Sequence, residues 1–140
     1  MTEQTHSFPA KMSVFRHLKK HIDDFCRGAR LSAADRHRLT LVAEELFSNT
    51  VRHGHGGDSD APVEITLEAG PSAVTLTYVD TAPEYDSLEA AMRTDIESTI
   101  NQRRIGGLGM ALTFALAESA HYSFADGRNR IVISLARKNS

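Results

Sequence analysis

The chain has 140 residues, of which 41% are hydrophobic and 24% charged, and its formal net charge is −2. These values are typical of one soluble globular domain that can bury its own core. The sequence lacks the concentrated basic field of nucleic-acid-binding proteins, so we expect no nucleic acid among its partners. A short basic run at Lys19 and Lys20 falls on an expected helix and is interpreted as the solvated face of that helix.

Cysteine content and the N-terminal sequence bear on the compartment. Cys26 is the one cysteine, so it cannot form an internal disulfide, and we expect a buried small hydrophobic residue rather than a reactive thiol. The N-terminal residues lack the basic and apolar segments of a signal peptide, and no stretch has the apolar length of a membrane span. We therefore expect a cytoplasmic protein with no membrane partner.

The first half of the chain predicts two helices. Residues 11–28 place apolar side chains at steps of three and four, and Gly28 suits the end of that helix. Ser32 then predicts the N-cap of a second helix, with Asp35 three residues further on. This helix is expected to reach about Val51 and to bury Leu39, Val42, Ala43, Leu46, Phe47 and Thr50.

A β-hairpin is predicted next. Residues 54–62 are rich in glycine and aspartate and indicate a loop. Residues 63–68 and 74–79 alternate apolar and polar side chains, which is typical of strands. The intervening residues 69–72 suit a turn, so the two strands are expected to pair as an antiparallel hairpin.

The second half predicts a long irregular segment, a helix and a second hairpin. Residues 80–108 lack a sustained period apart from a short helix expected at 88–92, and a long segment of this kind is usually functional. The later elements are a helix at 108–120 and strands at 121–125 and 130–136, joined by a turn at 126–129. Together the elements predict one α+β domain over residues 1–140, a two-layer sandwich whose mostly antiparallel sheet is covered on one face by helices.

Three polar residues interrupt the buried face of the second helix. Projected at about 100° per residue, Asn49 and His53 fall inside the stripe around Leu46, and Glu45 falls at its edge. Burying such groups without partners costs on the order of 1–3 kcal/mol each. Neighbouring backbone groups could satisfy any one of them, but three in a row before Gly54 favour a ligand site. The amide oxygen of Asn49 suits magnesium, and the Glu45 carboxylate could accept a proton.

A glycine run is the second candidate element. Residues 106–109 read Gly-Gly-Leu-Gly and precede an apolar helix. Glycines let the backbone approach a ligand, and a helix N-terminus favours phosphate, although a flexible hinge explains the glycines nearly as well. Arg103 and Arg104 could reach a phosphate or could be solvated loop charges.

Asp80 is the third candidate. It ends a predicted strand and is followed by Thr81, Ala82 and Pro83. By itself this pattern favours an ordinary turn residue, although a carboxylate could also accept a hydrogen bond from the amino group of adenine.

In chain order, these three elements resemble the N, G1 and G2 boxes of the GHKL ATPases, the superfamily of gyrase, Hsp90, histidine kinases and MutL. Residues 44–54 match the N box, residues 80–83 the G1 box and residues 106–112 the G2 box, and the resemblance covers about residues 8–137. The chain is most similar to the bacterial anti-sigma factor serine/threonine-protein kinases, which are single domains of about this size. Histidine kinases carry a phospho-accepting helical hairpin that does not fit here, and the other types need further domains.

The resemblance implies a Bergerat ATP-binding fold with ATP and Mg²⁺ as cofactors. In it, Asn49 would coordinate the magnesium, Glu45 would be the general base, and Asp80 would bind the adenine amino group. Residues of about 84–105 would form the ATP lid. The implied cofactor-binding residues are Asn49, His53, Gly54, Asp80, Ala82, Arg104, Gly106, Gly107, Leu108, Gly109 and Met110.

The implied function is that of an anti-sigma factor with kinase activity. It would sequester a sigma factor and phosphorylate a serine or threonine of a STAS-domain anti-anti-sigma partner. A non-catalytic ATP-binding module of the same fold, which only sequesters a partner, is the alternative. Members of this family often form homodimers, and residues 7–15 could supply an edge strand or a helix for one, or could belong to the core.

Two further points bear on the site. Ala82 stands where the family has its G1 glycine, and because alanine disfavours positive φ, the replacement suggests a reduced adenine affinity. A transition-metal site on His53, His55 and Asp58 is a weaker alternative, because a third histidine or cysteine at suitable spacing is missing.

Overall fold

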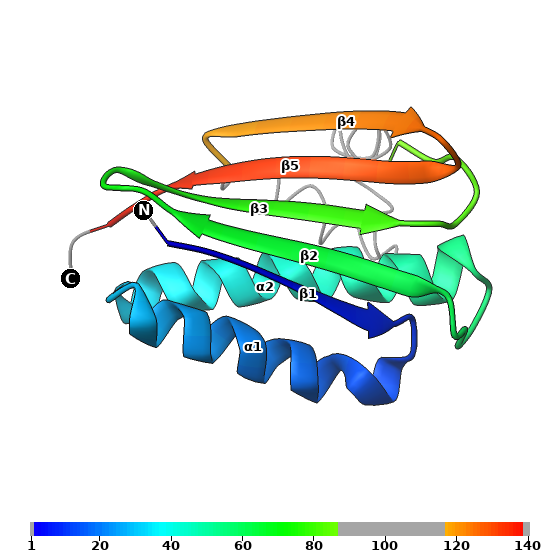
Figure 1. Cartoon of the computed structure of the whole chain (residues 1–140), viewed down its shortest axis with the longest axis horizontal. Helices are drawn as coiled ribbons and strands as arrows, with labels where there is room; N and C mark the ends of the chain where they lie inside the picture. The colour runs from blue at the N-terminus through cyan, green and yellow to red at the C-terminus, as the bar shows by residue number, and fades with distance from the viewer. Residues whose placement is uncertain (1, 87–116, 139–140) are drawn as a thin grey trace, which may run out of the picture.

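A five-stranded sheet with two helices against one face makes up the part of the chain that the computed structural model describes, residues 2–86 and 117–138 (Figure 1). The strands lie in the order β1-β2-β3-β5-β4, and each neighbouring pair is antiparallel. The predicted α+β fold class is thus confirmed. The strands are β1 (Thr2–Pro9), β2 (Pro62–Ala69), β3 (Ala73–Asp80), β4 (Ser119–Ala125) and β5 (Arg128–Ala136).

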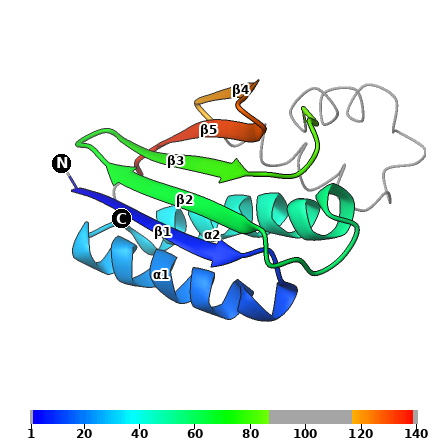
Figure 2. The ribbon, with the colours of Figure 1, turned by 45° about the vertical axis from the view of Figure 1, so that its right-hand side comes forward.

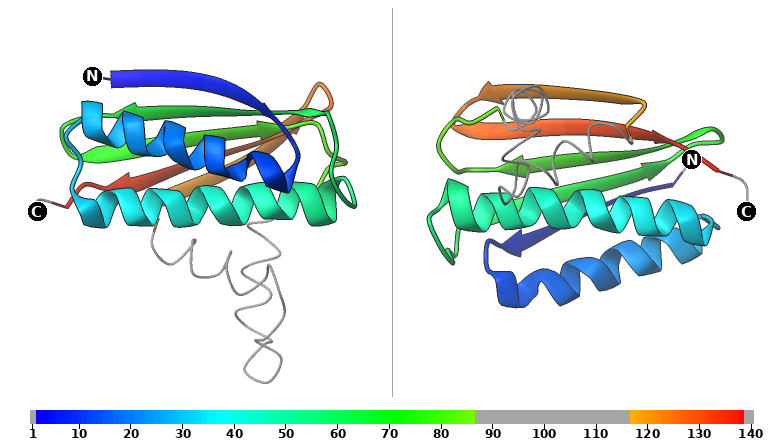
Figure 3. Two further views of the ribbon diagram at one scale, coloured as in Figure 1. Left: turned by 90° about the horizontal axis from the view of Figure 1, so that it is seen from below. Right: turned by 180° about the vertical axis from the view of Figure 1, so that it is seen from behind.

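The helices form a single layer beneath the sheet. A 3-10 turn at Met12–Val14 leads into α1 (Phe15–Gly28), and α2 is Ala33–Asn49, so both predicted helices are confirmed. Figure 2 shows α1 under the β1 side of the sheet, and the view from below in Figure 3 shows α2 beside it. β4 lies farthest from the two helices (Figure 1). No helix among the described residues is long and apolar enough to span a membrane.

The start of α2 is fixed by a side-chain cap and by the C-terminal strand. The Ser32 hydroxyl accepts a hydrogen bond from the backbone N–H of Asp35 at 3.1 Å, which confirms the predicted N-cap. The Asp35 carboxylate pairs with Arg38 and accepts from the Lys138 N–H at 3.0 and 3.1 Å. Burial of this pair ties the N-terminus of α2 to the residues that follow β5.

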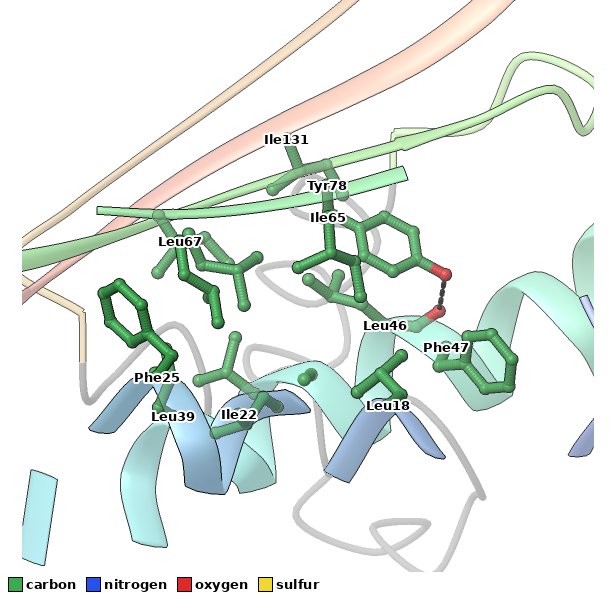
Figure 4. Packing of buried hydrophobic residues seen from close by; sticks show 14 of the residues in the cluster. Leu18, Ile22, Phe25, Leu39, Leu46, Phe47, Ile65, Leu67, Tyr78 and Ile131 are labelled. Carbon is green, nitrogen blue, oxygen red and sulfur yellow. Dashed lines mark hydrogen bonds between the residues drawn. The ribbon is translucent and has the colours of Figure 1, made fainter. Parts of the chain in front are cut away.

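The core lies between the sheet and the helix layer, where alternate strand residues face α1 and α2 (Figure 4). Full burial of one large apolar side chain stabilises the fold by about 1.5–3 kcal/mol. The six residues predicted for the buried face of α2 are all buried. Among the largest fully buried side chains are Leu18, Ile22, Phe25, Leu39, Phe47, Ile65, Leu67, Leu76, Ile133 and Leu135.

Cys26 belongs to this core. Its side chain is buried on α1, and burial raises the pKa of the thiol to about 11. The expectation of a buried residue is thus confirmed, and a thiol with such a pKa is almost fully protonated near neutral pH.

β1 has no counterpart among the predicted strands. It is an edge strand paired with β2, and its residues 3–7 are exposed, so it shows none of the apolar alternation on which strand prediction depends. Of residues 7–15, the first three belong to this edge strand and the last four to the helical turns, while Ala10 is fully buried.

The boundaries of the second hairpin also differ from the prediction. The helix predicted at 108–120 is wrong for its last four residues, because residues 117 and 118 are not helical and β4 begins at Ser119. Residues 108–116 lie outside the described residues, as does the short helix predicted at 88–92. The four-residue turn is wrong as well, because β5 begins at Arg128. Asp126 and Gly127 both have positive φ (55° and 73°), as in a two-residue type I′ hairpin turn.

Candidate functional site

The C-terminal end of α2 carries the polar residues singled out by the sequence. Glu45 and Asn49 are half-buried, one turn apart. Beyond Asn49 the helix widens into a π turn at Thr50–Gly54, where the His55 N–H donates to the Thr50 carbonyl at 2.9 Å. A π turn changes the helical phase and is frequent at functional sites.

His53 is exposed, so its predicted position inside the buried stripe is wrong. The projection assumed regular α-helical spacing, and the π turn rotates residues after Asn49 away from that spacing. Thr50, at the first position of the π turn, is buried as predicted and is 4% exposed.

The environment of Glu45 suits a proton acceptor. Burial raises the pKa of the Glu45 carboxyl, the neighbouring Glu44 raises it further, and Arg52 opposes both effects. A carboxylate with a raised pKa is a stronger base and can take a proton more readily near neutral pH.

Asn49 has the chemistry of a ligand for a hard cation. Its side chain makes no hydrogen bond to another described residue, so its carboxamide oxygen is available. Amide and carboxylate oxygens are the ligands that magnesium prefers, and Glu45 lies one helical turn away. The residues present therefore fit a magnesium ion with further ligands from a bound nucleotide.

Asp80 ends β3 in a buried position and is 7% exposed. Its Oδ2 accepts from the Thr50 hydroxyl at 2.7 Å. Its Oδ1 accepts from Asn129 Nδ2 at 2.9 Å and from the Ala82 N–H at 3.2 Å. Three donors, from the π turn after α2, from β5 and from the turn after β3, therefore hold this carboxylate in one orientation.

A chain of hydroxyls extends this arrangement into the core. Tyr78 OH lies 2.6 Å from Thr50 Oγ1 and 3.2 Å from the Leu46 carbonyl, the contact drawn in Figure 4. Complete burial raises the pKa of the Tyr78 phenol well above its usual value, so it acts only as a neutral group. β3 and α2 are thus joined by buried hydrogen bonds as well as by apolar contact.

Gly54 and Ala82 bring the N-box and G1 segments into direct contact. A Cβ added at Gly54 would lie only 2.8 Å from the Ala82 Cβ. Ala82 is 4% exposed, and its φ is not positive. An alanine therefore fits here without backbone strain, so strain gives no reason to expect reduced adenine affinity.

The structure brings four predicted site residues close together. They are Asn49 and Asp80, which are linked through Thr50, and Gly54 and Ala82, which are in contact. Thr50, the residue after Asn49, donates a hydrogen bond to Asp80, and Gly54 packs directly against the side chain of Ala82. The predicted lid lies outside the described residues from position 87 onward. The same holds for Arg104, Gly106, Gly107, Leu108, Gly109 and Met110.

Thr50, Tyr78 and Asn129 were not among the predicted site residues. Asn129 heads a series of alternate buried positions on β5 that continues with Ile131, Ile133 and Leu135. A polar side chain at the end of an apolar stripe is the signal that identified Asn49 on α2. Applied to strands with period two, it would have identified Asn129 as well.

Among the described residues no group of three or more histidine, cysteine, aspartate or glutamate side chains is placed to hold a metal ion. Asp58 accepts a hydrogen bond from the Met12 N–H at 3.1 Å. The alternative transition-metal site at His53, His55 and Asp58 therefore has no support in this geometry.

A separate groove of about 480 Å³ runs between α1 and α2 and contains none of the candidate site residues. It is lined by Phe15, Lys19, Asp23, Ala33, Arg36, His37, Thr40 and Glu44.

Comparison with known proteins decides the family. The family model described as histidine kinase-like ATPase domain matches residues 8–135. The chain belongs to this family. Membership in an ATP-binding ATPase family implies that the chain binds a nucleotide.

The chain is similar to one kinase in sequence and to two solved structures in fold. The serine/threonine-protein kinase BtrW of Bordetella bronchiseptica is 28% identical over 105 residues, which are 75% of this chain and 73% of BtrW. The solved RsbU and RsbW domains of Rv1364c from Mycobacterium tuberculosis share the fold with a TM-score of 0.67 at 15% identity, over 99% of this chain. The chain spans 34% of that longer protein. The catalytic domain of histidine kinase ThkA gives a TM-score of 0.54 at 14% identity, covering 96% of this chain and 97% of that domain.

Proposed function

We propose that the chain is an anti-sigma factor with ATP-dependent serine/threonine-protein kinase activity. It sequesters a sigma factor and phosphorylates a STAS-domain partner in the cytoplasm. The relative BtrW, itself described as a serine/threonine-protein kinase, supports the class of activity.

The observation that carries the proposal is the joint between α2 and β3. Thr50 directly follows Asn49, and its hydroxyl bonds Asp80 Oδ2 at 2.7 Å. One buried contact thereby holds Asn49, the candidate magnesium ligand, close to Asp80, the candidate adenine-binding residue. A single nucleotide site requires these two residues to be held in a fixed arrangement.

Each residue has a distinct proposed role. Asn49 would hold Mg²⁺, which supplies neutralisation of phosphate charge, and Asp80 would accept a hydrogen bond from the adenine amino group. The Glu45 carboxylate takes the proton of the acceptor hydroxyl while that oxygen bonds the γ-phosphorus. The bond from the γ-phosphorus to the β,γ-bridging oxygen breaks, and ADP leaves.

The remaining predictions concern the rest of the site and the assembly. We propose residues 84–105 as the ATP lid of a single domain. Phosphate is proposed to bind at the backbone of Gly106, Gly107 and Gly109, with further contacts from Arg104, Leu108 and Met110. Homodimerisation stays a prediction, to which β1 adds an edge strand that can pair with a second chain.

Radiolabelled phosphoryl transfer to the cognate STAS protein tests the kinase proposal. Glu45→Ala should abolish transfer and keep MgATP binding, whereas Glu44→Ala, on the exposed neighbouring residue, should keep both. Asn49→Ala should weaken magnesium-dependent ATP binding, with Ser48→Ala as its matched control.

The outcomes separate the two candidate functions. ATP binding by the wild-type protein without any transfer would identify the non-catalytic module. Unchanged magnesium-dependent binding by Asn49→Ala would refute the site assignment itself.

A further inference from the structure

Asn129 lies directly opposite Asp80 in the register of β3 and β5 and is 6% exposed. Its Nδ2 lies 2.9 Å from Asp80 Oδ1. The same nitrogen lies 2.9 Å from the Ala82 carbonyl oxygen and 3.1 Å from that of Pro83. One amino group therefore bonds the Asp80 carboxylate and the turn that follows it.

The other end of the carboxamide is equally well bound. Asn129 Oδ1 accepts from Tyr122 OH at 2.5 Å and from the Tyr85 N–H at 3.1 Å. Since a backbone N–H can only donate, this contact determines which end of the amide is the oxygen. Asn129 thus connects β4, β3 and the segment from Ala82 to Tyr85, with both polar atoms satisfied.

The hydrogen bonds to Asp80 limit what else it can bind. A carboxylate offers about four acceptor positions. Asn129 and the Ala82 N–H use two of them on Oδ1, and Thr50 uses one on Oδ2. Among the contacts of the described residues, one acceptor position on Oδ2 is left.

We propose that Asn129 is a positioning residue that determines the base preference of the nucleotide site. By holding Oδ1 of Asp80, its carboxamide orients the carboxylate so that the remaining position on Oδ2 can accept one donor. A 6-amino purine brings an N–H donor to such a position, whereas a 6-oxo purine brings an oxygen that a carboxylate repels. The inference rests on the proposed ATP site at Asp80.

Thr50 and the Ala82 N–H do not replace this role. Thr50 holds only Oδ2, and the Ala82 N–H belongs to the same turn as Asp80 and moves with it. Asn129 is the contact that anchors both the carboxylate and the turn to a separate strand, so its loss should free the two together.

Calorimetric titration with MgATP and MgGTP tests the inference on the wild type and two variants. Asn129→Ala should weaken ATP binding about tenfold or more, which equals about 1.4 kcal/mol, and should narrow the ratio of GTP to ATP dissociation constants. Asn129→Asp keeps the shape and the acceptor for Tyr122, but it places an oxygen against Asp80 Oδ1. It should therefore bind ATP more weakly than Asn129→Ala.

A purely structural role for Asn129 predicts a different order. Shape alone would make the isosteric Asn129→Asp the better variant, and ATP and GTP affinities would fall in parallel. Either result overturns the inference. Tyr122→Phe removes one of the two donors to Asn129 Oδ1 and leaves the bond from Asn129 Nδ2 to Asp80 in place. This variant should therefore keep the wild-type preference for ATP over GTP.

Folding and the underlying function are controlled separately. Thermal unfolding identifies variants that have lost their fold, and Asn129→Ser replaces Asn129→Ala if the latter does not fold. Absence of MgATP binding by the wild type would overturn the proposed function. Wild-type binding with unchanged base preference in the folded variants would overturn only the role of Asn129.

Discussion

The contact between Gly54 and Ala82 allows a sharp test of how the end of α2 and the turn after β3 fit together. Gly54→Ala would place a new Cβ 2.8 Å from the Ala82 Cβ. Carbon atoms in favourable contact are about 3.5–4.0 Å apart, so the two segments would have to separate by about 0.7 Å or more. The φ of Gly54 is not positive, so the backbone itself accepts alanine.

The expected magnitude follows from two opposing effects. Overpacking of a buried contact costs about 1–3 kcal/mol, and replacing glycine by alanine in helical backbone returns about 0.5–1 kcal/mol. Gly54→Ala should therefore lower the free energy of unfolding by up to about 2.5 kcal/mol. Ala82→Gly removes the opposing methyl, so the double variant should be more stable than the sum of the single effects by about 1–2 kcal/mol.

Urea unfolding followed by circular dichroism measures the stability of the wild type, the two single variants and the double variant, which together form a double-mutant cycle. Gly28→Ala is the matched control, because a Cβ added at Gly28 has no atom within 4 Å; it should leave stability unchanged or slightly raised. Gly54→Ala should also weaken MgATP binding, and Ala82→Gly should restore it. Additivity of the two substitutions within about 0.5 kcal/mol would show that Gly54 and Ala82 are not in contact.

Three further predictions concern the site and the core. The rate of phosphoryl transfer should fall at acidic pH with a midpoint above the ordinary glutamate pKa of 4.5, because the pKa of Glu45 is raised. Glu44→Gln removes one cause of that rise and should move the midpoint to lower pH. An unchanged midpoint would contradict the assignment of Glu45 as the base. Thr50→Val leaves the buried Asp80 Oδ2 without its hydroxyl donor and should cost about 1–3 kcal/mol in urea unfolding. Thr40→Val, at a half-buried position of α2 where the hydroxyl bonds only the Arg36 carbonyl in an exposed contact, should be nearly neutral. Burial and nearby His6 lower the pKa of His21, so the folded protein favours the neutral ring and loses stability as pH falls below 6.5; His21→Phe should flatten thermal stability between about pH 7 and pH 5.

How far the sequence predicts this fold depends on how each element is buried. α2 could be predicted with its cap because one strongly periodic face is buried and Ser32 supplies a local hydrogen bond. β2 and β3 could be predicted because one face of each strand is apolar. β1 could not, because its hydrogen bonds to β2 are backbone contacts and its exposed residues 3–7 carry no apolar alternation.

The site was partly predictable for the same reason. Glu45, Asn49 and Asp80 are visible as polar interruptions of apolar patterns. The links between them are not, since Thr50 pairs with Asp80 across 30 positions and Asn129 with Asp80 across 49. Such contacts depend on the strand order β3-β5-β4, which no local pattern specifies. The exposed position of His53 depends on a π turn, which regular helical projection does not foresee.

The rate at which a reagent labels the buried thiol of Cys26 can be used to measure the stability of the native protein. The chain has one cysteine, and its side chain is buried on α1, so a thiol reagent can reach it only when α1 opens. When opening and closing are fast relative to modification, the labelling rate reports the free energy of opening, with a tenfold change for each 1.4 kcal/mol. Binding of a nucleotide to the native state alone would slow this labelling in proportion to its concentration over Kd. Ligand affinity could therefore be read from an unmodified chain by mass spectrometry, even in a mixture of proteins.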